Sequence, residues 1–443
     1  MIHRFTAFRG LITMQKSLPR AIYAITGVLV LLFAGLVYAW STLSKPLMNL
    51  WSQDALTWTS TIVMVFFCLG GFLGGQMQKR GLSVKLNLII SAVLMIGGFL
   101  ITGLAGHMTG SIVIIYLGYG LLAGLGAGLA YNAVLSAVSG WFPDKQGLIS
   151  GILLMGFGIS AFLMGLLYAA NVDQMDGNGG IPWYICFVAF GIGCFVFLFL
   201  GGLILKKPGL DFVAPASKGG KKSKNISAPY EELPPSQMVK RASFWLMFAW
   251  AVLTSVAGLG VVFLGTPIAT AAVPALNNSA SLLAVIVGLI SIFNGIGRII
   301  FGGLFDKIGY KATLVIVCGL FIISMGVIIL ALVTGSQMIL IISYILTGLS
   351  FGGVTPSQSA FVNKFYGSRN YGQNLPIITM NLLIASFGTK LVQAVQAGLM
   401  AGGMTNSGAY IVVLAGVAVI CVIAGIIALF IKKPPAAQAF SQK

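Results

Sequence analysis

Acidic side chains are scarce in this chain of 443 residues, which contains eight Asp and Glu residues against 26 Lys and Arg residues. Each of the eight falls between the apolar stretches or at the end of one: Asp54, Asp144, Asp173, Asp176, Asp211, Glu231, Glu232 and Asp306. Both histidines, His3 and His107, also lie outside the apolar stretches. If those stretches cross a membrane, no carboxylate or imidazole is left at mid-depth to bind a cation or relay protons. The sequence therefore argues against a cation carrier and against a proton relay built from the protein's own acids.

Cysteine is also sparse, and none of it is arranged to bind a metal. The five cysteines each fall inside an apolar stretch, and no two have CxxC spacing: Cys68, Cys186, Cys194, Cys318 and Cys421. This pattern provides neither a zinc site nor a disulfide framework. The apolar stretches also lack paired carboxylates and a nucleophile with a neighbouring base. We therefore expect no enzyme activity, no metal and no cofactor.

Hydrophobic residues make up 58% of the chain and charged residues 8%, a balance outside the range of soluble domains. Twelve apolar stretches are each long enough, at about 20 residues, to cross a bilayer as a helix. They span 21–44, 56–77, 84–106, 111–138, 148–170, 182–205, 243–265, 281–304, 311–333, 337–362, 372–400 and 408–431. The strands of an outer-membrane barrel would alternate apolar and polar residues instead. The sequence predicts an all-α polytopic membrane protein with twelve transmembrane helices.

The formal net charge of +18 would suit nucleic acid if the basic residues shared one face. They are instead dispersed over alternate connections between the apolar stretches, whereas the intervening connections are poor in Lys and Arg. Lys and Arg concentrate in the cytoplasmic loops of membrane proteins. We therefore expect both termini in the cytoplasm, a location in the bacterial cytoplasmic membrane, and no nucleic-acid partner.

The chain divides into two similar parts. Residues 206–242 form the one long polar connection, rich in Pro, Ser, Gly and Lys, and it is typical of a solvated linker, although it could also bind anionic lipid or a partner. GGQMQKRG (74–81) and GGLFDKIG (302–309) lie 228 positions apart, and WFPDKQG (141–147) and YGSRNYG (366–372) lie 225 apart. This repeat predicts six-helix halves at 21–205 and 243–431, with a basic N-terminal arm (1–20) in place of a cleavable signal peptide and a C-terminal tail (432–443).

Arg298 lies deep inside the apolar stretch 281–304. Its distance from Asp306 corresponds to about 12 Å of helix, in a hydrocarbon core about 30 Å thick. A charge at that depth normally faces a bundle interior or a water-filled cavity. Because no acid is available there and the guanidinium fork suits a carboxylate, we expect Arg298 to bind an organic anion. The alternative is an arginine that pairs with backbone carbonyls and only braces the helices.

The segment after the eighth stretch resembles the loop signature of the major facilitator superfamily, G-x-x-x-D-[KR]-x-G-x-[KR]. The matching residues are Gly302, Asp306, Lys307, Gly309 and Lys311. The copy after the second stretch is degraded, because Gln78 stands where the aspartate would be. The resemblance implies the superfamily's fold of two six-helix halves and a conformational gating role for Asp306, Lys307, Gly302 and Gly309. We place Arg369, in the corresponding loop after the tenth stretch, in the same gating group.

Four further segments resemble the oxalate/formate antiporter family: WFPDKQGLISG (141–151), SFW (243–245), FNGIGR (293–298) and SRNYG (368–372). In that family an arginine of the eighth span binds a substrate carboxylate, and Arg298 occupies the matching place. The resemblance also implies an aromatic lining of the substrate site from Tyr38, Tyr131 and Phe351. The oxalate exchanger of the family has a lysine in the eleventh span, where this chain has Ile378, or Asn381 if a small gap is allowed. The second cation of that exchanger is therefore missing.

Lys390 lies further along the eleventh stretch, about 27 Å of helix beyond Gly372. This distance places its ammonium group near the outer membrane face. Lys390 either attracts anions into an outward vestibule and belongs to the substrate site, or it snorkels to the interface.

One deep cation predicts a monocarboxylate substrate such as formate, lactate or pyruvate, moved by alternating access as antiport or as symport in which the substrate carries the proton. Four neutral side chains could instead hydrogen-bond a second carboxylate, which keeps oxalate or another dicarboxylate open: Asn294, Asn381, Gln358 and Ser357. The sequence is also compatible with an exporter of neutral or amphipathic compounds in which Arg298 is structural, and with an anion sensor that does not transport. We expect the small carboxylate and the lipid bilayer to be the partners of a monomer.

Overall fold

The computed structural model describes residues 18–173, 179–209 and 230–433. Most of the N-terminal arm, the middle of the linker and most of the C-terminal tail lie outside the described residues, as do His3, Asp176 and Asp211. Within the described part, helices account for nearly all regular structure, and a single isolated bridge joins Val172 and Ile181.

Twelve helices in the described residues are long and apolar enough to cross a membrane, which confirms the all-α, twelve-span prediction. In the first half they are α2 (Arg20–Ala34) with η1 (Gly35–Ala39), α4 (Gln53–Lys79), α5 (Val84–Leu100) with η3 (Ile101–Ala105) and α6 (Gly106–Thr109), α7 (Ile112–Ile115) with η4 (Tyr116–Ala123) and α8 (Gly124–Ser139), α9 (Gln146–Asn171) and α10 (Trp183–Ile204). In the second half they are α12 (Ala242–Ala272), α13 (Ala280–Ile308), α14 (Tyr310–Thr334), α15 (Gln337–Gly352) with α16 (Val354–Tyr366), α17 (Tyr371–Thr379) with α18 (Asn381–Ala401), and α19 (Asn406–Phe430). Short elements between them are α3 (Trp40–Leu43), η2 (Pro46–Asn49), α11 (Pro235–Met238) and η5 (Pro274–Asn278).

Several of the long helices are interrupted or longer than expected. The first changes to a 3-10 segment at Gly35, and the eleventh is divided at Met380, between α17 and α18. The seventh continues to Ala272, past the expected end at 265, and keeps Pro267 inside it. Interruptions and internal prolines are tolerated in membrane helices where neighbouring helices satisfy the freed backbone groups.

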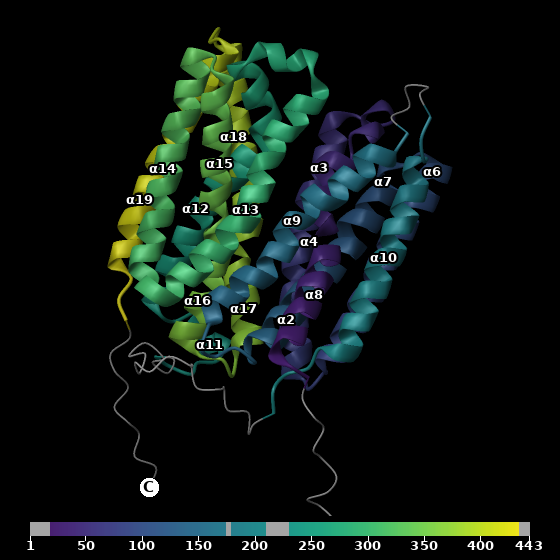
Figure 1. Ribbon diagram of the computed structural model, residues 1–443, viewed down its shortest axis with the longest axis vertical. Helices are drawn as coiled ribbons and strands as arrows, with labels where there is room; N and C mark the ends of the chain where they lie inside the picture. The colour runs from purple at the N-terminus through teal and green to yellow at the C-terminus, as the bar shows by residue number, and fades with distance from the viewer. Residues whose placement is uncertain (1–17, 174–178, 210–229, 434–443) are drawn as a thin grey trace, which may run out of the picture.

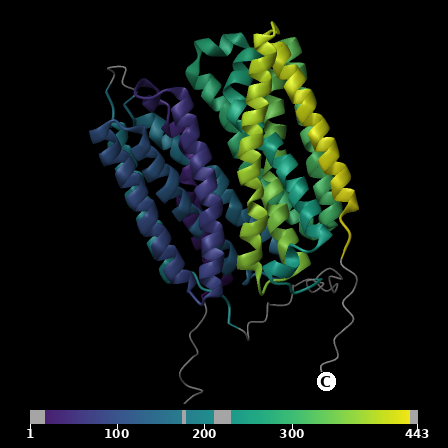
Figure 2. The same ribbon diagram turned by 180° about the vertical axis from the view of Figure 1, so that it is seen from behind.

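The two halves form separate bundles that lie side by side, the first in purple to blue-green and the second in green to yellow (Figures 1 and 2). They meet mainly where α9 packs against α13 and α16, and where α4 packs against α17 and α18. The repeat is visible in the backbone, because Gly81 and Gly309 follow α4 and α13 with φ of 89° and 85°. Glycine adopts this region without the strain that a Cβ would cause.

The described linker segment, which contains α11, lies at one end of the bundle, at the bottom of Figure 1. The loops that join α8 to α9 and α16 to α17 lie at the same end, as do the start of α2 and the end of α19 (Figure 1). We call this end the linker end and the opposite one the far end.

Candidate functional site

Arg298 lies well inside α13, about 15 Å of helix from Ile308 at the linker end and about 27 Å from Ala280 at the far end. It is 6% exposed. Its Nε donates a hydrogen bond to Asn294 Oδ1 at 2.9 Å, and its Nη1 donates one to the backbone oxygen of Leu154 at 2.5 Å. Because Leu154 belongs to α9, this guanidinium of the second half is bonded to the first half.

Three glycines of α9 face α13 and explain how the two helices approach so closely. A Cβ on Gly147 would collide with the backbone of Gly302, and a Cβ on Gly151 would collide with the backbone oxygen of Arg298. A Cβ on Gly158 would lie 3.0 Å from Arg298 Cζ. Glycine therefore provides the space in which the guanidinium lies, in line with the use of small residues where membrane helices pack closely.

The positive charge of Arg298 has no acidic partner among the described residues. The ion pairs recorded there join Arg20 to Asp144 and Arg241 to Glu231. A buried guanidinium stays protonated and needs acceptors for its five N–H groups. Arg298 finds two within the described chain, through Nε and Nη1, so Nη2 remains without a described acceptor. Among the described residues, the charge is therefore held by a neutral amide and a backbone carbonyl, the kind of pairing that the bracing alternative expects.

An aromatic cluster lies beside this charge. Tyr38 and Tyr131 are both within electrostatic range of the Arg298 guanidinium. Their rings lie edge-on to Phe157, with centroids 5.1 and 5.5 Å away, and Tyr131 is also 5.2 Å from Phe67. The structure thus brings Tyr38 and Tyr131 together near Arg298. That they line a substrate site stays a prediction.

A small cavity of about 10 Å³ borders the cluster, between α4, α8 and the break in the eleventh membrane helix. It has room for about one water molecule. Its lining residues are Phe67, Cys68, Gly71, Tyr131, Asn132, Pro376 and Thr379. Asn132 Oδ1 is buried and has no described donor, whereas its Nδ2 donates to the backbone oxygen of Gly372 at 2.9 Å. Interrupted helices beside a central cavity are common at the binding sites of membrane carriers.

Two residues expected at the site contact other parts of the molecule. Phe351 packs against Gly258 of α12, inside the second half. Lys390 lies in α18, with Nζ 5.9 Å from the ring centroid of Trp58, about 13 Å of helix beyond Asn381 toward the far end. Their roles in binding stay predictions.

The two positions considered for a second cation are also occupied by other contacts. Ile378 is fully buried. Asn381 Nδ2 donates to the backbone oxygen of Ala251 at 3.0 Å and to Ser255 Oγ at 2.8 Å. Its Oδ1 is buried without a described donor. The α17–α18 break is therefore tied to α12 by a neutral amide.

Asp306 joins the halves at the linker end. Its Oδ1 accepts a hydrogen bond from the backbone N–H of Gly147 at 3.0 Å, and its Oδ2 accepts one from Leu148 at 2.9 Å. These amides belong to the first turn of α9, which begins at Gln146. N–H groups of a first turn have no partner within the helix, and the helix dipole favours an anion there. A carboxylate of one half therefore caps a helix of the other.

Further polar contacts between the halves lie beside this cap. Asn363 Nδ2 donates to Gln146 Oε1 at 2.6 Å, and Ser150 Oγ lies 2.6 Å from Ser359 Oγ. Both serines are buried. In this conformation the halves are thus held together at the linker end.

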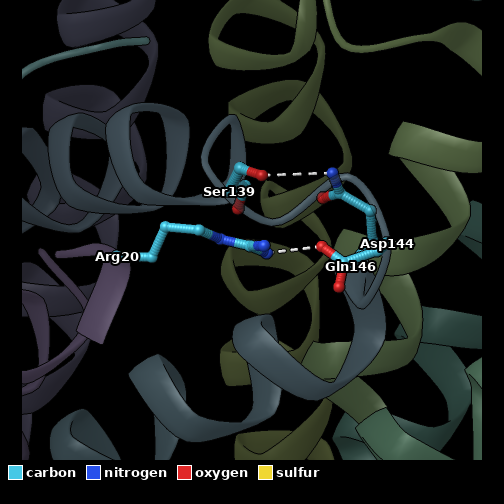
Figure 3. Close-up of polar contacts among 4 residues, drawn as sticks. All are labelled: Arg20, Ser139, Asp144 and Gln146. Carbon is cyan, nitrogen blue, oxygen red and sulfur yellow. Dashed lines mark hydrogen bonds and ion pairs between the residues drawn. The ribbon is translucent and has the colours of Figure 1, made fainter. Parts of the chain in front are cut away.

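The loop before α9 is anchored within the first half, as Figure 3 shows. Arg20 Nη2 lies 2.5 Å from Asp144 Oδ1, and the same guanidinium stacks over the Phe142 ring, 4.4 Å from its centroid. Gln146 Nε2 donates to the backbone oxygen of Ser139 at 3.1 Å. The WFPDKQG segment owes its fixed position to these contacts.

In the second half, a carboxylate of the linker accepts hydrogen bonds from the loop before α17. Glu232 Oε1 accepts from the backbone N–H of Ser368 and Oε2 accepts from that of Arg369, both at 3.2 Å. The linker is held in place because the backbone N–H of Leu233 donates to the backbone oxygen of Tyr366 at 3.1 Å. The Arg369 backbone therefore takes part in a contact between the linker and the loop that precedes Asn370, the N-cap residue of α17.

Gln78 occupies the place that Asp306 has in the other half. Its Oε1 accepts from Ser136 Oγ at 3.0 Å, and a Cβ on Gly372 would lie 2.9 Å from the same oxygen. Gln78 Nε2 is buried without a described partner. The contact between halves at this position is neutral.

The other residues of the predicted gate have simpler roles. Gly302 packs on Gly147, and Gly309 ends α13 with its positive φ. Lys307 is exposed, and Lys311 Nζ donates to the backbone oxygen of Leu429 at 3.0 Å.

Sequence reasoning missed the partners rather than the central residues. Neither Leu154 nor Gly158 was expected beside Arg298. Glu232 was treated as part of a solvated linker, and its capping contact has no local sequence signal.

Three comparisons agree with this architecture. The sequence profile of the Major Facilitator Superfamily matches residues 21–389. The chain is 24% identical to the oxalate:formate antiporter of Oxalobacter formigenes over 358 residues, which cover 80% of each protein. It is 36% identical to apicoplast pyruvate carrier 1 of Toxoplasma gondii over 108 residues, 24% of this chain and 19% of that one. The solved structure of the proton:xylose symporter XylE, bound to 6-bromo-6-deoxy-D-glucose, superposes with a TM-score of 0.69 at 14% identity, over 94% of this chain and 97% of that one.

Proposed function

This chain belongs to the major facilitator superfamily, and we propose that it carries small organic anions, in the first place monocarboxylates such as formate, lactate or pyruvate. The family and the fold identify a multi-pass membrane transporter rather than an enzyme. The observation that carries the proposal is the buried Arg298 guanidinium, which has no carboxylate partner in the described chain and lies beside Tyr38 and Tyr131.

The relatives support an anion as the cargo. One of them is named as an oxalate:formate antiporter and another as a pyruvate carrier. Oxalate is a second candidate because of the first relative, and the neutral contacts of Asn381 and the burial of Ile378 weigh against it. A dicarboxylate would have one carboxylate without a cation to bind it.

The mechanism follows from the position of the charge between the halves. A substrate carboxylate would bind Nη1 and Nη2 of Arg298 and replace the Leu154 carbonyl, which ties α13 to α9. The halves could then rock about the central site. Because an unpaired guanidinium is costly within the membrane, the empty carrier would reorient slowly. This favours exchange, or symport in which the substrate itself carries the proton.

The orientation is part of the proposal. Lys and Arg residues of the described loops gather at the linker end, so the linker end would face the cytoplasm. The contacts of Asp306, Asn363 and Ser150 would then close the cytoplasmic side in this conformation.

The test is uptake of labelled formate, lactate, pyruvate and oxalate into proteoliposomes loaded with the unlabelled anion. We expect Arg298→Gln to lower uptake at least about 100-fold, the size expected when a buried charge loses its partner. Arg80→Gln, at an exposed position after α4, is the matched control and should transport like the wild type. Equal uptake by wild type and Arg298→Gln would refute the role of Arg298 in binding the substrate carboxylate. Preference for oxalate over all monocarboxylates would refute the proposed substrate class.

A further inference from the structure

A much larger cavity lies at the linker end, away from Arg298. Its volume is about 790 Å³, and its walls come from α13, α14, α16, the segment after α19 and the linker. Asp144 and Gln146 of the first half complete one side. The transport mechanism proposed above assigns no role to this space.

Lysine dominates the charge of this cavity. Five lysines line it: Lys307, Lys311, Lys364, Lys432 and Lys433. The acids of the lining are Asp144, which is paired with Arg20, and Asp306, which caps α9. Asp306 also attracts Lys364, so each carboxylate already has a basic neighbour. Five lysines against two acids still leave the cavity with an excess of positive charge.

Two of the lysines converge on one aromatic ring. Lys364 Nζ lies 5.2 Å from the ring centroid of Tyr230, and Lys433 Nζ lies 5.7 Å from it. The ring is held in position because the Tyr230 N–H donates to the Lys364 backbone oxygen at 2.9 Å. Each ammonium is attracted to the ring, but the two repel each other, and an anion between them would remove that repulsion.

The start of α14 adds positive potential to the same wall. Gly309, Tyr310 and Lys311 all line the cavity, and α14 begins at Tyr310 without a side-chain cap. The N–H groups of an uncapped first turn favour an anion.

The segments of the chain whose placement is not described are poor in acidic residues. Residues 210–229 contain Lys218, Lys221, Lys222 and Lys224 but a single acid, Asp211. Residues 1–17 and 434–443 contain no Asp or Glu side chain. Because five lysines face two acids in the lining, the cavity favours an anion supplied by another molecule.

We propose that this cavity is a binding site for a phosphate-bearing anion, separate from the transport site. A phosphate group offers several acceptor oxygens and more than one charge, and lysines bind it as point charges. The phosphate belongs either to the headgroup of an anionic phospholipid, since Lys432 and Lys433 lie directly after α19, or to a soluble phosphate compound of the cytoplasm.

The chain provides a matched control for a test. Lys432 and Lys433 precede a proline at the end of the last membrane helix, and Lys206 and Lys207 precede a proline at the end of the sixth. The second doublet has the same sequence, KKP, and does not line the cavity. Lys432→Gln with Lys433→Gln and Lys206→Gln with Lys207→Gln therefore remove the same charge from equivalent places.

The full chain is placed in nanodiscs and two probes are compared. One is phosphatidylglycerol titrated into phosphatidylcholine discs and counted as bound lipid by native mass spectrometry, and the other is inorganic pyrophosphate followed by calorimetry in pure phosphatidylcholine discs. We expect one probe to bind, and the Lys432 and Lys433 pair of substitutions to weaken it about ten-fold, against less than about two-fold for the control pair. Binding of phosphatidylglycerol assigns the site to a lipid headgroup, and binding of pyrophosphate assigns it to a soluble phosphate. Equal weakening by both pairs, or no binding of either probe, overturns the proposal.

Discussion

The two halves meet at the linker end in different ways, although their backbones repeat each other. The helix start of the first half, at Gly147, is capped by Asp306 from the opposite half. In the second half, Glu232 from the linker accepts instead from the backbone N–H groups of Ser368 and Arg369, in the loop before α17. Gln78, which corresponds to Asp306, contributes a neutral contact. The comparison teaches that separating the halves at this end removes the Asp306 cap of α9 and leaves the contact between Glu232 and the loop before α17 in place.

The same asymmetry appears deeper in the membrane. The repeat relates Arg298 to Gly70 and Gly158 to Leu383. A Cβ on Gly70 would collide with the backbone oxygen of Leu125, within its own half, whereas Arg298 bonds to Leu154 across the interface. The buried guanidinium and the glycine that makes room for it thus occur at one of the two positions that the repeat relates. Four substitutions test this difference between the halves.

The largest effect is expected for Gly158→Leu. A leucine side chain in α9 would occupy the place of the guanidinium, because a Cβ there already lies 3.0 Å from Arg298 Cζ. Uptake should fall about 100-fold, as for loss of the buried charge contact itself. Gly165→Ala, in the same helix, has 3.4 Å to its nearest neighbour and is the control for helix folding. If Gly158→Leu transports normally, Arg298 is not confined by α9 as described.

Asp306→Asn is expected to have the next largest effect. The asparagine loses the charge and one of the two acceptor oxygens, so the first turn of α9 should open more often. Hydrogen–deuterium exchange at Gly147 and Leu148 should become about 5- to 10-fold faster, with no change at Ser368 and Arg369. Unchanged exchange in α9 would contradict the cap between the halves.

Glu232→Gln is the reciprocal experiment, and its effect should be smaller because this contact is exposed. Exchange at Ser368 and Arg369 should rise about 2- to 5-fold, while Gly147 keeps its rate and uptake stays close to that of the wild type. If uptake measured for Glu232→Gln fell as far as uptake measured for Asp306→Asn, the two carboxylates would be equivalent in transport.

Gln78→Glu should give the smallest change. The new carboxylate would lie beside Gly372 and restore a charge at the repeated position, which strengthens the contact between the halves at the linker end. Uptake by Gln78→Glu should fall about 2- to 3-fold. Gln78→Ala adds no charge beside Gly372, so it should not lower uptake by strengthening the contact between the halves. Faster uptake by Gln78→Glu would contradict the assignment of this end as the one that must open.

The sequence predicted the features that depend on local composition. Hydropathy located all twelve spans, and the depth of Arg298 followed from counting residues to Asp306. The division of the eleventh helix at Met380 was signalled only indirectly by Pro376, because the break depends on how α17 and α18 pack against their neighbours.

Contacts between distant segments could not be predicted in the same way. Nothing in one sequence tells which face of α15 bears Phe351, which packs on Gly258, or that Glu232 would reach Ser368. The sequence also gave no sign that Lys390 would lie near Trp58, which belongs to the other half. Such pairs depend on how the helices pack against one another. Hydropathy does not tell which residues of two helices lie side by side.

The division of the eleventh membrane helix has a mechanical consequence. α17 is fastened at the linker end, where Asn374 Nδ2 donates to the Leu233 oxygen, whereas α18 is fastened to α12 by Asn381. A continuous rod would force both attachments to move together, but a joint at Met380 lets one segment tilt while the other keeps its place. Thr379, next to this joint, lines the small cavity, so a water molecule bound there would touch the place where the two segments part.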